Sequence, residues 1–146
     1  MNNQKKQLQP RSIALAVLLG GIVATVLNVG WYLVTHASGV DFIMQPDPSK
    51  PAALITIPRV AIATMIPAFI AGGLLMLLQR FTKQPARTFL VISIAFALLS
   101  LAGPATVAGA TGGTRMALII MHLIAAVIIA GALLRQARAT DSTTAQ

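Results

Sequence analysis

The stretch TRMALIIMHLIAAVIIAGALLRQ, residues Thr114 to Gln136, decides the fold class. Between Arg115 and Arg135 every side chain is apolar except that of His122. A helix of about 20 residues, rising about 1.5 Å per residue, crosses the roughly 30 Å of hydrocarbon in a bilayer. The stretch therefore predicts a membrane-spanning helix with a titratable ring inside it.

The rest of the 146-residue chain has the same character, with 56% hydrophobic residues and only 10% charged ones. Soluble domains carry about a quarter charged residues, so this composition indicates a membrane protein. The net charge of +8 is also found in nucleic-acid-binding proteins, but here the Lys and Arg residues flank apolar segments. We therefore expect no nucleic-acid partner. Because cysteine is absent, there is no disulfide framework and no thiolate metal site.

Four apolar segments are long enough to span a membrane, and we place them at 13–35, 59–78, 88–110 and 114–134. The first is too long for the apolar core of a signal peptide, which runs about 7 to 15 residues. A short basic turn at 79–87 makes the second and third spans antiparallel neighbours. The prediction is an all-α membrane protein, one domain forming an antiparallel up-down bundle of four transmembrane helices. The polar tail 139–146 is expected to be disordered.

The basic residues predict the orientation of the bundle. One side holds most of them, and by the positive-inside rule it is cytoplasmic, as are both termini; these residues are Lys5, Lys6, Arg11, Arg80, Lys83, Arg87, Arg135 and Arg138. The outer loop, 36–58, contains four prolines and several apolar residues. Such a segment cannot continue a helix, so we expect it on the outer membrane surface or over the helix ends. A passive surface loop is favoured over a lid.

Polar side chains within the spans fall at similar depths. His122 lies roughly 12 Å below the outer surface, at about the level of Ser100, with Asn28 and Thr64 somewhat shallower. A polar group that faces lipid costs on the order of 1 to 3 kcal/mol. We therefore expect all four side chains to turn inward and to hydrogen-bond one another as a polar layer.

Three further residues are predicted to have structural roles. Pro67 lies inside the second span and frees the carbonyl of Ala63, for which His122 or Asn28 could supply a donor. Gly103 and Pro104 form a Gly-Pro break near the outer interface, before a turn of small residues.

His122 has two main interpretations. We favour a structural role, in which its ring joins two helices through a hydrogen bond. The alternative is that the ring contacts a ligand or carries a proton. No metal site or cofactor is predicted. A haem held by two histidines would need His36 and His122, whose depths differ by about 12 Å. The prediction of a copper site formed by His122 and nearby methionines has little support, because methionine at such positions usually faces lipid. No Asp or Glu lies within a span, which argues against a cation exporter built on a buried carboxylate.

The order of the spans and the proline-bearing outer loop accompany two motifs, LSLAGP at Leu99–Pro104 and ALIIMHLIAA at Ala117–Ala126. Together they resemble a family of small bacterial four-helix membrane proteins of unknown function. The resemblance implies a bacterial inner membrane and makes Met121, His122 and Leu123 a family feature. It implies no activity.

Three function classes stay open. An accessory or structural membrane protein is favoured, surrounded by the lipid bilayer and associated with another membrane protein or a second copy. The first alternative is a ligand-binding or transport protein with an outward-open polar pocket around His122. The second is a membrane enzyme acting on a lipid or quinone, which needs a second catalytic group beside His122.

Overall fold

Four long helices make up most of the protein. The computed structural model describes residues 10–45, 47 and 49–143, with the backbone alone for 139–143. The helices are α1 (Pro10–Ala37), α2 (Ile57–Phe81), α3 (Pro85–Ser100), which the short α4 (Ala102–Thr106) continues, and α5 (Gly112–Thr143). When α3 and α4 are counted as one helix, each of the four helices is long and apolar enough to cross a membrane. The predicted largely α-helical fold, with four helices that are long and apolar enough to span a membrane, is confirmed.

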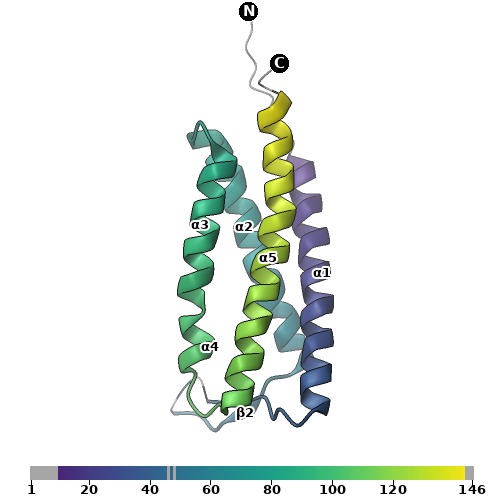
Figure 1. Cartoon of the computed structure of the whole chain (residues 1–146), viewed down its shortest axis with the longest axis vertical. Helices are drawn as coiled ribbons and strands as arrows, with labels where there is room; N and C mark the ends of the chain where they lie inside the picture. Colours follow the sequence, from purple (N-terminus) through teal and green to yellow (C-terminus); the bar gives the residue numbers. More distant parts are fainter. Residues whose placement is uncertain (1–9, 46, 48, 144–146) are drawn as a thin grey trace, which may run out of the picture.

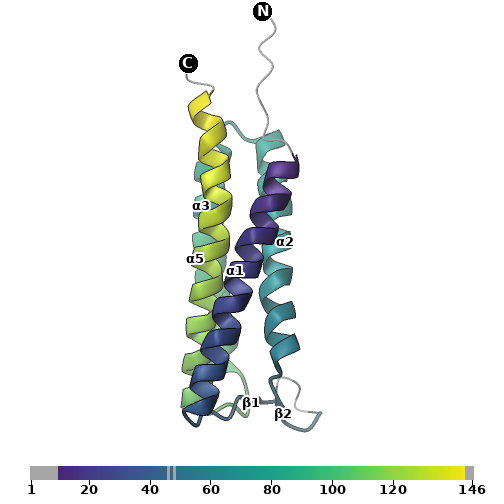
Figure 2. The same ribbon diagram turned by 90° about the vertical axis from the view of Figure 1, so that its right-hand side faces the viewer.

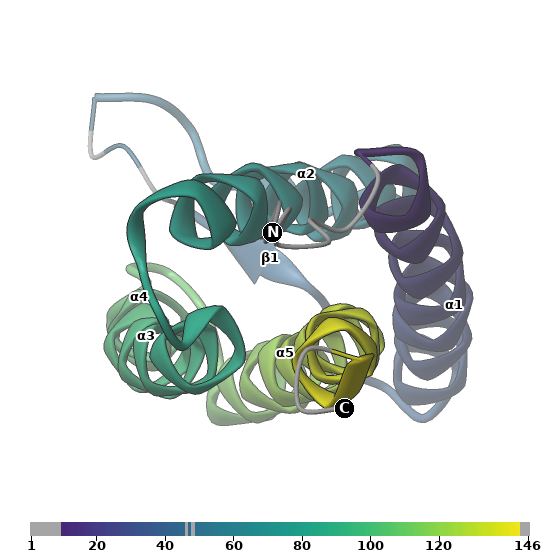
Figure 3. The same ribbon diagram turned by 90° about the horizontal axis from the view of Figure 1, so that it is seen from above.

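The helices lie side by side around a common centre. Figure 1 shows the beginning of α1, the end of α5 and the α2–α3 connection at one end of the molecule. Seen along the bundle in Figure 3, the helices follow the order α1, α2, α3, α5, so that α1 and α3 lie at opposite corners. Helix α1 packs mainly against α5 and α2, whereas α3 packs against α5 and α2 from the other side.

Small residues allow the helices to approach closely. The Cα atom of Gly20 faces the Cβ atom of Ala132 on α5, and Gly72 on α2 faces the side chain of Val17. Ala24 and Ala68 are completely buried between α1 and α2. This packing is expected in lipid, where helices associate through close van der Waals contact.

The third span differs from the predicted helix 88–110. The helix begins at Pro85, is interrupted at Leu101 and ends at Thr106. Pro104 causes the interruption, because it has no N–H group to donate to the carbonyl of Ser100. The helix resumes where the Ala105 N–H donates to the Leu101 carbonyl, at 3.1 Å. The prediction of helix for 107–110 was wrong, since Gly109 adopts a φ of +71°, outside the helical range.

The three residues predicted to have structural roles, Pro67, Gly103 and Pro104, differ in their surroundings. Pro104 is buried, whereas Gly103 is exposed and has open space where a Cβ atom would lie. Helix α2 continues through Pro67 without interruption.

Helix α5 is longer than the predicted span. It continues to Thr143, past Arg138, where disorder was expected to begin. Residues 136–140, QARAT, include Gln, Ala and Arg, which favour helix, and no Gly or Pro ends the run. Residues 144–146 of the predicted tail, like Lys5 and Lys6, lie outside the described part of the chain.

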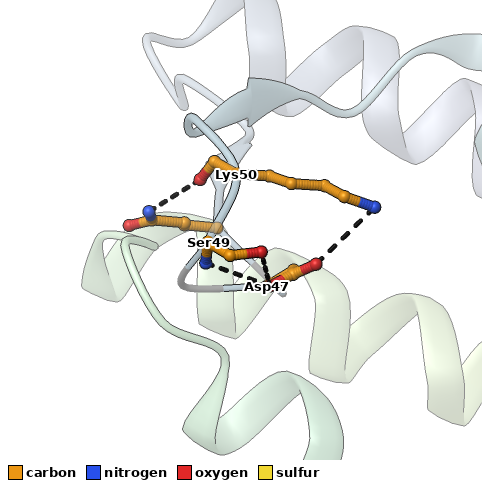
Figure 4. Close-up of polar contacts among 4 residues, drawn as sticks. Asp47, Ser49 and Lys50 are labelled. Carbon is orange, nitrogen blue, oxygen red and sulfur yellow. Dashed lines mark hydrogen bonds and ion pairs between the residues drawn. The ribbon is translucent and has the colours of Figure 1, made fainter.

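Residues 38–56 are called the cap, and their described part, 38–45, 47 and 49–56, folds over the end of the bundle opposite to the α2–α3 connection (Figure 2). Strands β1 (Ile43–Met44) and β2 (Ala53–Leu54) pair antiparallel, with Ile43 opposite Leu54. At the hairpin tip, the Asp47 carboxylate accepts hydrogen bonds from the Ser49 N–H and hydroxyl and lies 3.6 Å from Lys50 Nζ (Figure 4). The Gln45 N–H donates to the Ala108 carbonyl at 2.8 Å, which ties the cap to the α4–α5 connection.

Candidate functional site

Two of the four predicted polar-layer residues meet inside the bundle. Asn28 of α1 donates from Nδ2 to the Thr64 hydroxyl of α2 at 3.0 Å, and both side chains are buried. The Thr64 hydroxyl donates in turn to the Val60 carbonyl at 2.9 Å. The other Asn28 amide atom, Oδ1, is buried and accepts no hydrogen bond from the described residues. The pair joins α1 to α2 and leaves one buried acceptor open.

His122 does not join this pair. Its ring is exposed, and Nδ1 lies 3.2 Å from the Leu118 carbonyl, one turn earlier in the same helix. At this depth the neighbouring Met121 and Ala117 fill the buried face of α5. Each residue of a helix turns about 100° from the one before, so His122 points away from that face. The expectation that His122 would bond a polar group of another helix was wrong.

Ser100 also forms a local hydrogen bond. Its hydroxyl donates to the Ala97 carbonyl of α3 at 2.8 Å, and the side chain is half-buried. The carbonyl of Ala63 receives neither of the donors proposed for it, because Asn28 bonds Thr64 and His122 bonds Leu118. The polar layer is therefore a two-residue contact between α1 and α2.

An aromatic cluster beneath the cap was not recognised from the sequence. The Tyr32 hydroxyl, near the end of α1, donates to the Ile55 carbonyl of the cap at 2.8 Å. The Phe42 ring is completely buried with its centroid 4.4 Å from that of Tyr32, and His36 stacks on Tyr32 at 5.5 Å. Phe42 adopts a φ of +50°, an unusual conformation for a bulky residue. The sequence did contain one indication of this cluster, because the loop with four prolines also holds several apolar residues that need a place to be buried.

Asp41 fastens the cap to the start of α5. Its carboxylate accepts a hydrogen bond from the Thr114 hydroxyl at 2.6 Å and from the Thr111 hydroxyl at 3.3 Å. Thr114 is fully buried. The Thr114 hydrogen bond favours the ionised form of Asp41 and lowers the pKa of this carboxyl below its ordinary value of 3.8. The cap is therefore packed against the helix ends, which is one of the two positions expected for it from the sequence.

The described side chains that could bind a metal ion do not gather into a cluster. Within the described ranges, no three His, Asp or Glu side chains gather where they could hold a metal ion. Met121 is buried, while Met116 is exposed on another face of the same helix, so the methionines do not converge with His122. The hydrogen bonds of Asn28, Tyr32 and Asp41 connect parts of the chain to one another.

Two apolar grooves run along the seams between helices. The larger, of about 800 Å³, lies between α1 and α5 and includes Gly30, Trp31, Leu123 and Val127. The smaller, of about 170 Å³, lies between α1 and α2 beside Gly72 and Gly73. His122 lines neither groove.

The comparisons with known proteins identify a family but no activity. Residues 8–139 match the sequence model of a family described as "Family of unknown function (DUF6069)". The match covers most of the chain, so the protein belongs to this family. No curated protein matches the chain. No solved structure matches it either.

Proposed function

Because membership of this family assigns no reaction, we propose a function from the geometry: an accessory or structural membrane protein that binds another membrane protein through α3. The proposal places an antiparallel up-down bundle in the bacterial cell membrane, with both termini in the cytoplasm. The polar contacts support it over the transport and enzyme alternatives. They hold the helices and cap together, while His122 is exposed and bonded to its own helix.

The orientation follows from the distribution of charge over the bundle. Arg80, Lys83 and Arg87 lie around the α2–α3 connection, at the same end as the start of α1 and the end of α5 (Figure 1). The other end carries Lys50 in the cap and Arg59 and Arg115 in the first turns of α2 and α5, and Asp41 and Asp47 balance part of this charge. The positive-inside rule then assigns the α2–α3 end to the cytoplasm.

The packing of α3 carries the proposal of a partner. Only Ala86 and Phe89 of its 16 residues are buried, whereas α1 buries eight of 28. From Val91 onward, α3 exposes bulky apolar side chains on most of its surface, namely Val91, Ile94, Phe96, Leu98 and Leu99. Transmembrane helices are held together by close side-chain packing, and α3 obtains little of it from its own chain. A second protein surface against α3 supplies the missing contacts.

Photocrosslinking in native membranes tests the proposal. Benzoylphenylalanine at Leu99, which is 75% exposed on α3, is compared with the same residue at Ile70, which is 63% exposed on α2. We expect a discrete protein adduct from position 99, either with a second copy or with another membrane protein, and lipid adducts alone from position 70. Lipid adducts alone from both positions would contradict the accessory function.

A further inference from the structure

We propose that the groove between α1 and α5 binds one glycerophospholipid, with an acyl chain lying in the groove and an ester carbonyl accepting a hydrogen bond from Trp31. This site is independent of the proposed function, because it lies on a different seam from α3. The occupant is drawn from the leaflet next to the cap.

The shape of the groove fits a hydrocarbon chain. The two helices are in close contact at Gly20 and Ala132, whereas at Gly30, nearer the cap, nothing lies within 4 Å of where a Cβ atom would be. The floor of the groove is therefore open at Gly30, and its walls are apolar side chains such as Val34 and Val127. Along α1 the groove runs from Val26 to Val34, about 12 Å, most of the roughly 15 Å depth of one leaflet.

Trp31 supplies the polar contact. Its indole Nε1 atom is buried and has no hydrogen-bond partner among the described residues. Buried indole N–H groups normally find an acceptor, and one left without a partner costs free energy. The proposal requires the ring, which lines the groove, to rotate about χ2 so that the N–H turns from its buried position toward the lipid; this angle varies broadly in tryptophan.

The depth of Trp31 identifies the acceptor. Helix α1 has 28 residues and is about 42 Å long, so each end extends about 6 Å beyond a hydrocarbon core of about 30 Å. Trp31 lies six residues before the end at Ala37, about 9 Å along the helix, and therefore about 3 Å inside the core boundary. Indole rings concentrate at this boundary, where the ester carbonyls of glycerolipids lie next to the start of their chains.

The test uses the fluorescence of Trp31, because it is the only tryptophan in the chain. Phosphatidylglycerol with dibrominated acyl chains is titrated into the full-length protein in detergent micelles, and bromine quenches the indole on contact. We expect saturable quenching at a low ratio of lipid to detergent. Gly30→Leu fills the floor of the groove and should weaken binding by about tenfold or more, while Gly103→Leu, at an open glycine on α4, should not.

Two further arms make the result decisive. Val127→Phe fills the groove from α5 at a side chain that is 72% exposed, so it should weaken binding without disturbing the core. A brominated dialkyl-ether lipid lacks the carbonyl and should bind about fivefold more weakly than the ester lipid. Quenching without saturation in the wild type, or equal binding by the groove-filling variants, would overturn the site. Equal binding of ester and ether lipids would overturn the contact with Trp31.

Discussion

At Gly72 a single added methyl group is expected to disturb the contact between α1 and α2. An alanine Cβ atom there would overlap the side chain of Val17, which is buried and, being β-branched, has few rotamers available in a helix. We expect Gly72→Ala to destabilise the protein by about 1 to 3 kcal/mol. The measurement is unfolding in mixed micelles with increasing sodium dodecyl sulfate.

The adjacent glycine provides the matched control. Gly73 has nothing within 4 Å of an added Cβ atom, and alanine favours helix over glycine by up to about 1 kcal/mol. Gly73→Ala should therefore leave stability unchanged or slightly higher. Equal destabilisation by the two substitutions would show that the Val17 contact is not what requires glycine at position 72.

Individual polar residues were predictable where burial leaves few options. Asn28 and Thr64 lie in spans whose neighbouring residues pack tightly, and a buried amide and hydroxyl satisfy each other most easily across a helix interface. His122 was not predictable in this way, because α5 is apolar around most of its circumference and no hydrophobic period shows which face is inward. A histidine on such a helix can form a hydrogen bond with the backbone carbonyl four residues earlier, as His122 does with Leu118.

The cap is the element whose stability should depend on acid. The pKa of Asp41 is lowered in the folded state, chiefly by the Thr114 hydrogen bond, so ionised Asp41 stabilises the cap above its ordinary pKa of 3.8. This contribution is lost as the pH falls below 3.8 and through the lowered folded value. Hydrogen exchange in residues 40–57, corrected for intrinsic rates, should therefore accelerate in acid.

Two variants separate Asp41 from the other carboxylate of the cap. Asp41→Asn should accelerate exchange at neutral pH and reduce its further rise in acid. Asp47→Asn should affect only the tip, because that carboxylate bonds Ser49 and Lys50 within the same turn. If the two variants exchange alike across the cap, the contact between Asp41 and Thr114 is not what fastens it.

The elements were predictable to different degrees for a physical reason. A membrane span is determined by local length and hydropathy, and the structure has four such helices at the expected places. The interruption at Leu101 depends on Pro104, a local signal that the sequence did contain. The cap depends on contacts between distant residues, such as Asp41 with Thr114, 73 positions apart. Its prolines and apolar residues do not specify those contacts.

For the whole molecule, the charge distribution predicts sidedness. Reporter fusions at Ser38 or Asp47, in the cap, should be active outside the cytoplasm. Fusions at Lys83 or after Arg138 should be active inside it, because these positions lie at the basic end of the bundle. A cytoplasmic signal from either cap position would reverse the assignment of the two ends.

The pairing of α1 with α5 has a consequence for biosynthesis. Gly20 packs against Ala132, and the ribosome adds more than a hundred residues between the two. At roughly 10 residues per second, the nascent α1 waits about ten seconds for α5, while α2 becomes available much earlier. During that interval, one face of α1 must be shielded by the insertion machinery or by lipid. A message truncated before α5 therefore yields a chain whose first helix lacks one of its two main packing partners.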